Sequence, residues 1–184
     1  MLIGASGRID RWTSSPQLVI AMQVLRFDSS SNNTFAATSE HLTDDEAAAL
    51  EADLTEALVL FSGGRFTRFA AVEREFVQPG AQVRTVRTGQ IVVGRFSGLR
   101  TAIKSIGLGG RSARPTGSIR AGSVMLDADY DRLDSRRQLL RIHELGHALG
   151  FNHVTSRVSI MNPQLGPQPT ATDREAVRLV AGVS

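Results

Sequence analysis

Cysteine is absent from the 184 residues of this chain. Disulfide bonds and thiolate metal ligands are therefore excluded. No hydrophobic run approaches the ~20 residues that a helix needs to cross a bilayer. Residues 1–11 also lack the basic start and apolar stretch of a secretory signal. We therefore expect no membrane anchor in this chain.

The composition is otherwise that of an ordinary globular protein, with 41% hydrophobic and 21% charged residues. This length predicts one domain with a sizeable core. The charge is uneven, because residues 27–64 contain eight acids and no Lys or Arg, whereas residues 76–126 contain eight Lys or Arg and no acid. The basic stretch is typical of a surface that steers anions, or of a solvated face that pairs with the acidic helix; the second interpretation is simpler.

Histidine is scarce, and three of the four histidines fall within residues 143–153. If residues 139–149 are helical, His143 and His147 leave the same face one above the other. That spacing suits two nitrogen ligands of one Zn²⁺ at roughly 2.0–2.1 Å. Glu144 lies about 100° around the helix, beside the metal, where its carboxylate can take a proton from a zinc-bound water.

The third histidine requires the helix to end. In a straight helix His153 would lie about 15 Å along the axis from His143, beyond the reach of one ion. Gly150 stands where the chain must turn back, and glycine takes the left-handed conformation that ends helices at little cost. Three histidine ligands leave a fourth position for water or substrate, which is typical of catalytic zinc.

The run from His143 to His153 resembles the metzincin signature H-E-x-x-H-x-x-G-x-x-H. The family's second mark is a methionine turn, and residues 159–163 (Ser-Ile-Met-Asn-Pro) are similar to it, with Met161 eight residues after the third histidine. This short gap, and Pro163 closing the turn, resemble the matrixin branch. For H-E-x-x-H alone, two chance histidines on an exposed helix are the alternative, and the complete pattern argues against it.

This resemblance implies an α+β, zincin-like fold, with a twisted mixed sheet, two main helices and a small C-terminal subdomain. One domain would span residues 1–184, with an upper part of about 1–150 and a lower part of about 151–184. Met161 would form a hydrophobic floor under the ligands, and residues 162–168 a wall of the substrate pocket. The expected site consists of the metal ligands His143, His147 and His153, the general base Glu144, and the structural residues Gly150, Met161 and Pro163.

Matrixins also bind a second zinc and calcium before the helix that carries the motif. Residues 76–126 contain neither histidine nor carboxylate here, so we expect one catalytic zinc and no second zinc, and calcium is not favoured. Asp127, Asp129 and Asp131 alternate as calcium ligands sometimes do. Because no glycine or closing glutamate follows at EF-hand spacing, a solvated acidic turn is the simpler interpretation.

The other segments predict further strands and helices. Residues 97–118, rich in Gly, Ser and Arg, are expected to form a long functional or mobile loop, with an ordered part as the alternative. By resemblance, residues 119–128 would be the antiparallel edge strand that receives an extended peptide. Further strands are predicted at residues 18–27, 66–76 and 90–96. Capping boxes predict helices that begin at Thr43 with Glu46, Ser135 with Gln138, and Thr172 with Glu175.

Three functions remain open. The leading one is a zinc metalloendopeptidase, a monomer that acts on a peptide or protein substrate and binds neither membranes nor nucleic acid; the resemblance implies a secreted or periplasmic protein. The second is a zinc amidase that acts on a cell-wall peptide or another non-protein substrate. The third is a non-enzymatic module that binds polyanions through residues 84–120, with salt-sensitive affinity that survives loss of the metal. An intact Glu144 argues against the third.

Overall fold

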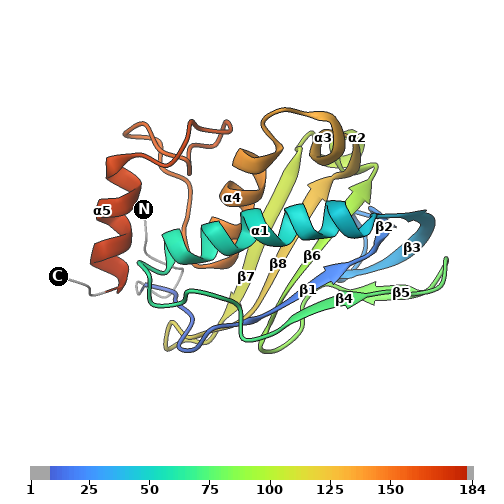
Figure 1. The fold of residues 1–184 in the computed structure, drawn as a ribbon, viewed down its shortest axis with the longest axis horizontal. Helices are drawn as coiled ribbons and strands as arrows, with labels where there is room; N and C mark the ends of the chain where they lie inside the picture. The colour runs from blue at the N-terminus through green and yellow to red at the C-terminus, as the bar shows by residue number, and fades with distance from the viewer. Residues whose placement is uncertain (1–8, 182–184) are drawn as a thin grey trace.

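The computed structural model describes residues 9–181, which form one mixed sheet with helices packed on it (Figure 1). The helices are α1 (Asp44–Phe61), α2 (Leu99–Ile103), α3 (Ala128–Leu133), α4 (Arg137–Ala148) and α5 (Ala171–Ala181). The strands are β1 (Gln17–Ala21), β2 (Gln23–Arg26), β3 (Thr34–His41), β4 (Val72–Glu75), β5 (Gln82–Arg84), β6 (Gln90–Ser97), β7 (Gly107–Ala113) and β8 (Ile119–Asp127). The predicted α+β class with a mixed sheet is confirmed.

Strand β6 is the centre of the sheet. It pairs in parallel with β8 on one side, and with β1 and then β2 on the other. Strand β4 lies beyond β1, whereas β3 and β5 lie beyond β2. Strand β7 pairs antiparallel with β8 and, among the described residues, with no other strand. The sheet therefore ends at a free edge beside α4.

Two hydrophobic cores lie on opposite faces of this sheet. Neighbouring residues of a strand point to opposite faces, and Val124 of β8 belongs to the larger core whereas Met125 belongs to the smaller one. The larger core joins α1 and α4 to the sheet through side chains such as Leu50 and Leu145. The smaller core includes Phe96, and the curl of β2, β3 and β5 covers it.

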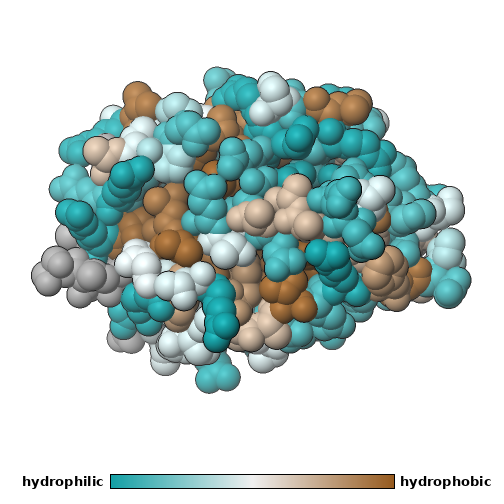
Figure 2. Space-filling model, viewed as in Figure 1, coloured by the Kyte–Doolittle hydropathy of each residue, from teal (hydrophilic) through white to brown (hydrophobic). Residues whose placement is uncertain are grey.

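Helix α1 begins and ends where local chemistry predicts. Thr43 and Glu46 form the expected capping box, and Gly63 and Gly64, with φ of 63° and 78°, stop the helix. The solvent face of α1 mixes hydrophilic and weakly hydrophobic atoms, while strongly hydrophobic atoms gather between α1 and α5 (Figure 2). Val177 of α5 is buried there as part of the larger core. None of the described helices is long and apolar enough to cross a membrane.

Two strand predictions were wrong in their bounds. Residues 18–27 form two strands, because the backbone at Met22 bonds Glu75 and Leu42 where the chain changes its outer partner from β4 to β3. Of residues 66–76, only β4 pairs with the sheet. Strands β3 and β5 were not predicted.

The long loop predicted at residues 97–118 was also wrong. This segment contains α2 and β7. Strand β8, predicted to be the edge, lies between β6 and β7, so β7 is the antiparallel edge strand. The many glycines of β7 hid it, because glycine weakens a strand prediction and is retained where another backbone approaches closely.

Two helix starts differ from the predicted capping boxes. Helix α4 has Arg136 at its N-cap without a side-chain bond, and Ser135 does not cap it. Before α5, Thr170 and Asp173 bond each other's backbone N–H groups, two residues ahead of the predicted pair. The proposed division into upper and lower parts stays a prediction.

In the acidic turn at residues 127–131, Asp129 is exposed as predicted, but Asp127 and Asp131 are buried, so the prediction of a solvated turn was wrong for these two. Asp127 accepts a hydrogen bond from the Tyr130 N–H and begins α3. Asp131 is completely buried between two guanidinium groups, at 2.7 Å from Arg95 Nε and 2.6 Å from Arg141 Nε. A carboxylate engaged in this way is a structural anion that joins β6, α3 and α4.

Candidate metal centre

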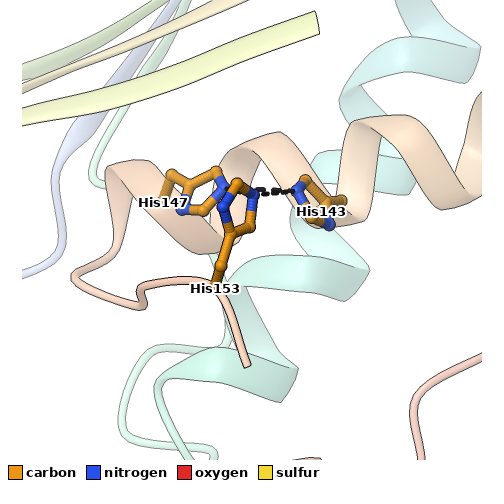
Figure 3. Close-up of side chains that lie close together, drawn as sticks. All are labelled: His143, His147 and His153. Atoms are coloured by element: carbon orange, nitrogen blue, oxygen red, sulfur yellow. Dashed lines mark hydrogen bonds between the residues drawn. The ribbon is translucent and has the colours of Figure 1, made fainter. Parts of the chain in front are cut away.

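The three motif histidines converge on one point (Figure 3). His143 and His147 project from successive turns of α4, and His153 reaches back from the segment that follows the helix. Their Nε2 atoms lie 3.2 Å apart between His143 and His147, 3.3 Å between His143 and His153, and 3.1 Å between His147 and His153. The structure thus brings together three side chains that the sequence spreads over eleven positions.

Backbone carbonyls fix the orientation of two of these rings. His143 Nδ1 lies 2.7 Å from the Ile160 carbonyl oxygen, and His147 Nδ1 lies 2.8 Å from the Phe151 carbonyl oxygen. A carbonyl only accepts hydrogen bonds, so Nδ1 carries the proton in both rings. Each Nε2 then presents a lone pair to the common point, as metal-binding histidines do.

This geometry fits a tetrahedral zinc ion. Bonds of roughly 2.0–2.1 Å in tetrahedral directions place two ligand nitrogens about 3.3 Å apart, close to the observed separations. Burial lowers the pKa of His143 and His153, and it lowers the pKa of His147 to about 4. The rings are therefore neutral at physiological pH, which is the form that binds metal.

Glu144 lies beside this triad, buried to 6% exposure under β7. Burial raises its pKa to about 7, although a hydrogen bond from the Gly109 backbone lowers it in part. A Cβ atom added at Gly107 would come within 2.5 Å of Glu144 Oε1, and one at Gly109 within 2.1 Å of the Glu144 carbonyl oxygen. Only glycine lets the edge strand lie this close to α4.

The turn after α4 is held by the N-terminal segment. Gly150 has φ of 115°, and a Cβ atom there would meet the Asp10 carbonyl oxygen at 2.2 Å, so glycine is required for both reasons. Trp12 Nε1 donates to the Ala148 carbonyl at 3.1 Å. The helix-ending role predicted for Gly150 thus has a second, unpredicted cause in the docked N-terminal segment.

Arg111 joins this segment to the edge strand. Its Nε lies 2.9 Å from Asp10 Oδ2, its Nη1 lies 3.4 Å from the His147 carbonyl oxygen, and its Nη2 lies 3.2 Å from Asn152 Oδ1. We call Asp10, Trp12 and Arg111 the N-terminal strap. It bonds the backbone carbonyls of His147 and Ala148 before the turn that leads from the second histidine to the third, and the side chain of Asn152 after it.

Met161 lies under the helix, buried to 1% exposure. A Cβ atom at Gly146 would come within 2.6 Å of Met161 Sδ and 2.9 Å of Phe61 Cζ, so this glycine makes room for the side chains of Met161 and Phe61. Asp173 of α5 holds the turn by accepting hydrogen bonds from Ser159 Oγ and, at 3.1 Å, from the Ile160 N–H. Helix α5 thereby fixes the carbonyl that orients His143.

A hollow of about 630 Å³ lies against the segment that follows the third histidine, which contributes Thr155 to its lining. Pro163 lies on it, and Asn162 Nδ2 donates to the Val154 carbonyl at 2.6 Å. Arg136 Nη2 donates to the Leu165 carbonyl at 2.6 Å and holds the far side of the loop. The hollow is lined by Arg136, Thr155 and the six residues from Asn162 to Pro167.

The basic stretch is not one solvated face. Arg95 is 1% exposed and pairs with Glu46 of α1 as well as with Asp131. Arg87 pairs with Glu75, and the strap contains Arg111. The interpretation of a solvated face that pairs with the acidic helix was therefore wrong for Arg95, which is buried.

Fold and site together define a metzincin-like metallopeptidase domain, with a zinc-type histidine triad at the end of a helix under an edge strand. The family model of the matrixins (peptidase family M10) matches residues 25–179, and the chain belongs to this family. Matrixins are zinc-dependent endopeptidases and are typically secreted. A comparison with curated protein sequences finds no match.

Sequence reasoning missed the residues that support the triad. Asp10, Arg111, Gly109 and Asp173 all touch the site or its supporting turns. They lie up to 137 positions from His147, and the residue types of Arg111 and Asp10 carry no local signal of their contacts. The glycine pair at 107 and 109 was the one available hint, since spaced glycines mark a close backbone approach.

Proposed function

We propose that this chain is a zinc endopeptidase whose metal is held by His143, His147 and His153. The observation that carries the proposal is the set of three Nε2 atoms within 3.1–3.3 Å of one another. Two of the rings have their Nδ1 protons tied to backbone carbonyls, so their free lone pairs converge. A bound zinc ion supplies Lewis-acid chemistry, which polarises the scissile carbonyl and makes water nucleophilic near neutral pH.

Glu144 is the proton carrier of the reaction. Its carboxylate takes a proton from the attacking water and then delivers it to the nitrogen of the leaving amine, as general base and then general acid. A carboxyl group whose burial raises its pKa to about 7 is suited to both steps, because neither proton form is strongly favoured at neutral pH. The Gly109 N–H holds the carboxyl group at the side of the triad.

The free edge of β7 is the proposed binding surface for the substrate backbone. Its outward N–H and C=O groups have no strand partner among the described residues. An extended peptide pairs with such an edge as one further strand. A peptide substrate placed there runs past Glu144, because Gly107 and Gly109 of the same strand touch that residue.

The hollow of about 630 Å³ beyond the triad is the proposed pocket for the side chain after the scissile bond. Its size lies within the range of ligand pockets. Residues 162–167, which line this hollow, belong to the segment 162–168 that is predicted to form a wall of the substrate pocket, and Arg136 bonds the Leu165 carbonyl there. Pro163 and Met161 are structural in this scheme and perform no chemistry.

Zinc dependence tests this function. The purified chain should contain about one zinc per molecule and should cut an unfolded protein. Cleavage should stop when a chelator removes the metal and should return when zinc is added back. A chain that holds zinc and cuts no peptide bond in any unfolded protein would contradict the proposal and would favour the amidase alternative. We also propose export from the cytoplasm, as is typical of the family.

A further inference from the structure

A second groove lies on the face of the sheet away from α1 and α4. It has a volume of about 510 Å³, within the range of ligand-binding sites. Its floor is formed by β7 and β8, and its opposite wall by Asn32, Asn33, Arg84 and Val86 near the ends of β3 and β5. We call it the back groove. The curl of the sheet forms it, at the open end beyond the smaller core.

The back groove and the metal centre share strand β7. Gly107 and Gly109 face α4, where a Cβ atom at either would meet Glu144. The residues that alternate with them, Leu108, Gly110 and Ser112, line the back groove. The two sites therefore lie on opposite faces of one edge strand.

The back groove is positively charged. Arg84 and Arg120 stand on its opposite sides, both are exposed, and neither forms an ion pair with a described residue. No acidic residue is among the described residues that line it. Arg120 Nε donates to Ser112 Oγ at 3.0 Å, which holds the guanidinium group over the floor. These two cations differ from Arg87 and Arg95, which acidic partners neutralise.

The floor of the back groove carries several small side chains beside the larger Leu108 and Met125. Gly110, Ser112, Ala121 and Ser123 leave room for a ligand to lie against the strands. The backbone groups of β7 and β8 are already paired with each other there, so a ligand cannot add as a strand and must be bound by side chains. The available groups are the two guanidiniums and the amides of Asn32 and Asn33, which suit carboxylates.

We propose that the back groove binds an acidic peptide segment. This proposal rests on the proposed endopeptidase function, because the acidic segment is taken to be part of the substrate protein. A substrate chain that lies along the free edge of β7 needs only about three to four further residues, at roughly 3.3 Å each, to pass round the edge to the other face. Acidic residues near the cleavage site would thus increase the affinity for a substrate.

Binding is tested first, with cleavage abolished. The probe is a fluorescent twelve-residue peptide of Glu, Asp and Gly, and the protein is the zinc-loaded Glu144→Ala chain. We expect binding that weakens steeply with salt. Adding Arg84→Ala or Arg120→Ala should weaken it about threefold to tenfold each. The matched control is Arg114→Ala, an exposed arginine of the same basic stretch outside the back groove, which should change binding by less than about twofold.

Cleavage provides the second test, with the parent chain and two substrates that share one neutral cleavage sequence. One substrate carries an acidic tail and the other carries the matching Asn and Gln tail. We expect a higher kcat/KM for the acidic tail, through a lower KM, and loss of this advantage in Arg84→Ala and Arg120→Ala.

Three outcomes overturn the assignment: no binding of the acidic probe, equal loss of binding in the Arg114→Ala control, or equal kcat/KM for both tails. A different result would show that the proposed peptidase function is wrong while the back groove is right. If the neutral-tail and acidic-tail substrates both remain uncut while the probe binds through Arg84 and Arg120, the back groove stands and the peptidase activity does not.

Discussion

Glycine at position 109 determines how closely the edge strand approaches the helix that carries the triad. A Cβ atom there would lie 2.1 Å from the Glu144 carbonyl oxygen and 2.8 Å from His147 Cβ. Neither neighbour is the far end of a flexible side chain, so one of the two elements must move to accommodate a methyl group. The next glycine, Gly110, faces the back groove, and a Cβ atom there meets only Ser123 Oγ at 3.6 Å.

This pair gives a matched prediction. We expect Gly109→Ala to destabilise the chain by about 1–3 kcal/mol through overpacking and to reduce peptidase activity. Gly110→Ala should cost less than about 1 kcal/mol and leave the cleavage of a substrate without an acidic tail near the parent value. Urea unfolding and cleavage rates measure both. Equal effects of the two substitutions would contradict the close approach of β7.

Asp131 stabilises the fold as a buried carboxylate. It is completely buried between Arg95 and Arg141, and Arg141 lies two positions before the first histidine. Arg141 also pairs with Asp53 of α1 at 2.7 Å. A single carboxylate therefore sets the position of α4 against the sheet and α3.

We expect Asp131→Asn to destabilise the chain by about 3–5 kcal/mol, because two buried guanidinium groups lose the one fully buried carboxylate that lies between them. Asp129→Asn serves as the control, since Asp129 lies on the same turn and is exposed, and it should change the unfolding free energy by less than about 0.5 kcal/mol. Thermal or denaturant unfolding distinguishes them. A mild effect at Asp131 would contradict the structural role of the buried cluster.

At the scale of elements, the N-terminal strap connects three segments far apart in the sequence. The segment before β1 docks on the turn after α4 through the Asp10 carbonyl and Trp12, and β7 contributes Arg111. The strap bonds the His147 carbonyl and Asn152, which stand on either side of the turn that brings back the third ligand. It therefore holds the third histidine at the distance that the metal requires.

We expect Arg111→Lys to weaken zinc binding by about tenfold, because lysine keeps the charge but cannot make three directed bonds at once. Competition with a zinc-binding dye measures this without reference to activity. Arg114→Lys, in the loop after β7, is the control and should leave the affinity unchanged. An unchanged affinity in Arg111→Lys would show that the turn is rigid without the strap.

The sequence predicts an element well when neighbouring residues determine it, and poorly when residues far along the chain do. The start of α1 was predictable, since Thr43 and Glu46 cap it locally. The triad was equally readable, because its spacing is set by one helix and Gly150. Strand β7 was not, because Gly107 and Gly109 are explained only by α4, which follows more than twenty positions later. The burial of Asp131 likewise depends on arginines from two other elements.

At the scale of the whole molecule, one curled sheet separates two surfaces with different tasks. One face carries α1, α4 and the larger core, and positions the histidine triad. The other face has the smaller core and, beyond it, the cationic back groove. The free edge of β7 lies between them, so a substrate chain at the edge has access to both.

Digestion of a mixed peptide library by the zinc-loaded chain, with Glu144→Ala in parallel, tests both the peptidase activity and the role of Glu144. We predict cuts by the parent that are absent from the variant, although both proteins hold zinc. The residues that flank the cuts would then describe the pocket beyond the triad. Identical cuts by parent and variant, or none by a zinc-loaded parent, would contradict the account of Glu144 as the proton carrier of an endopeptidase.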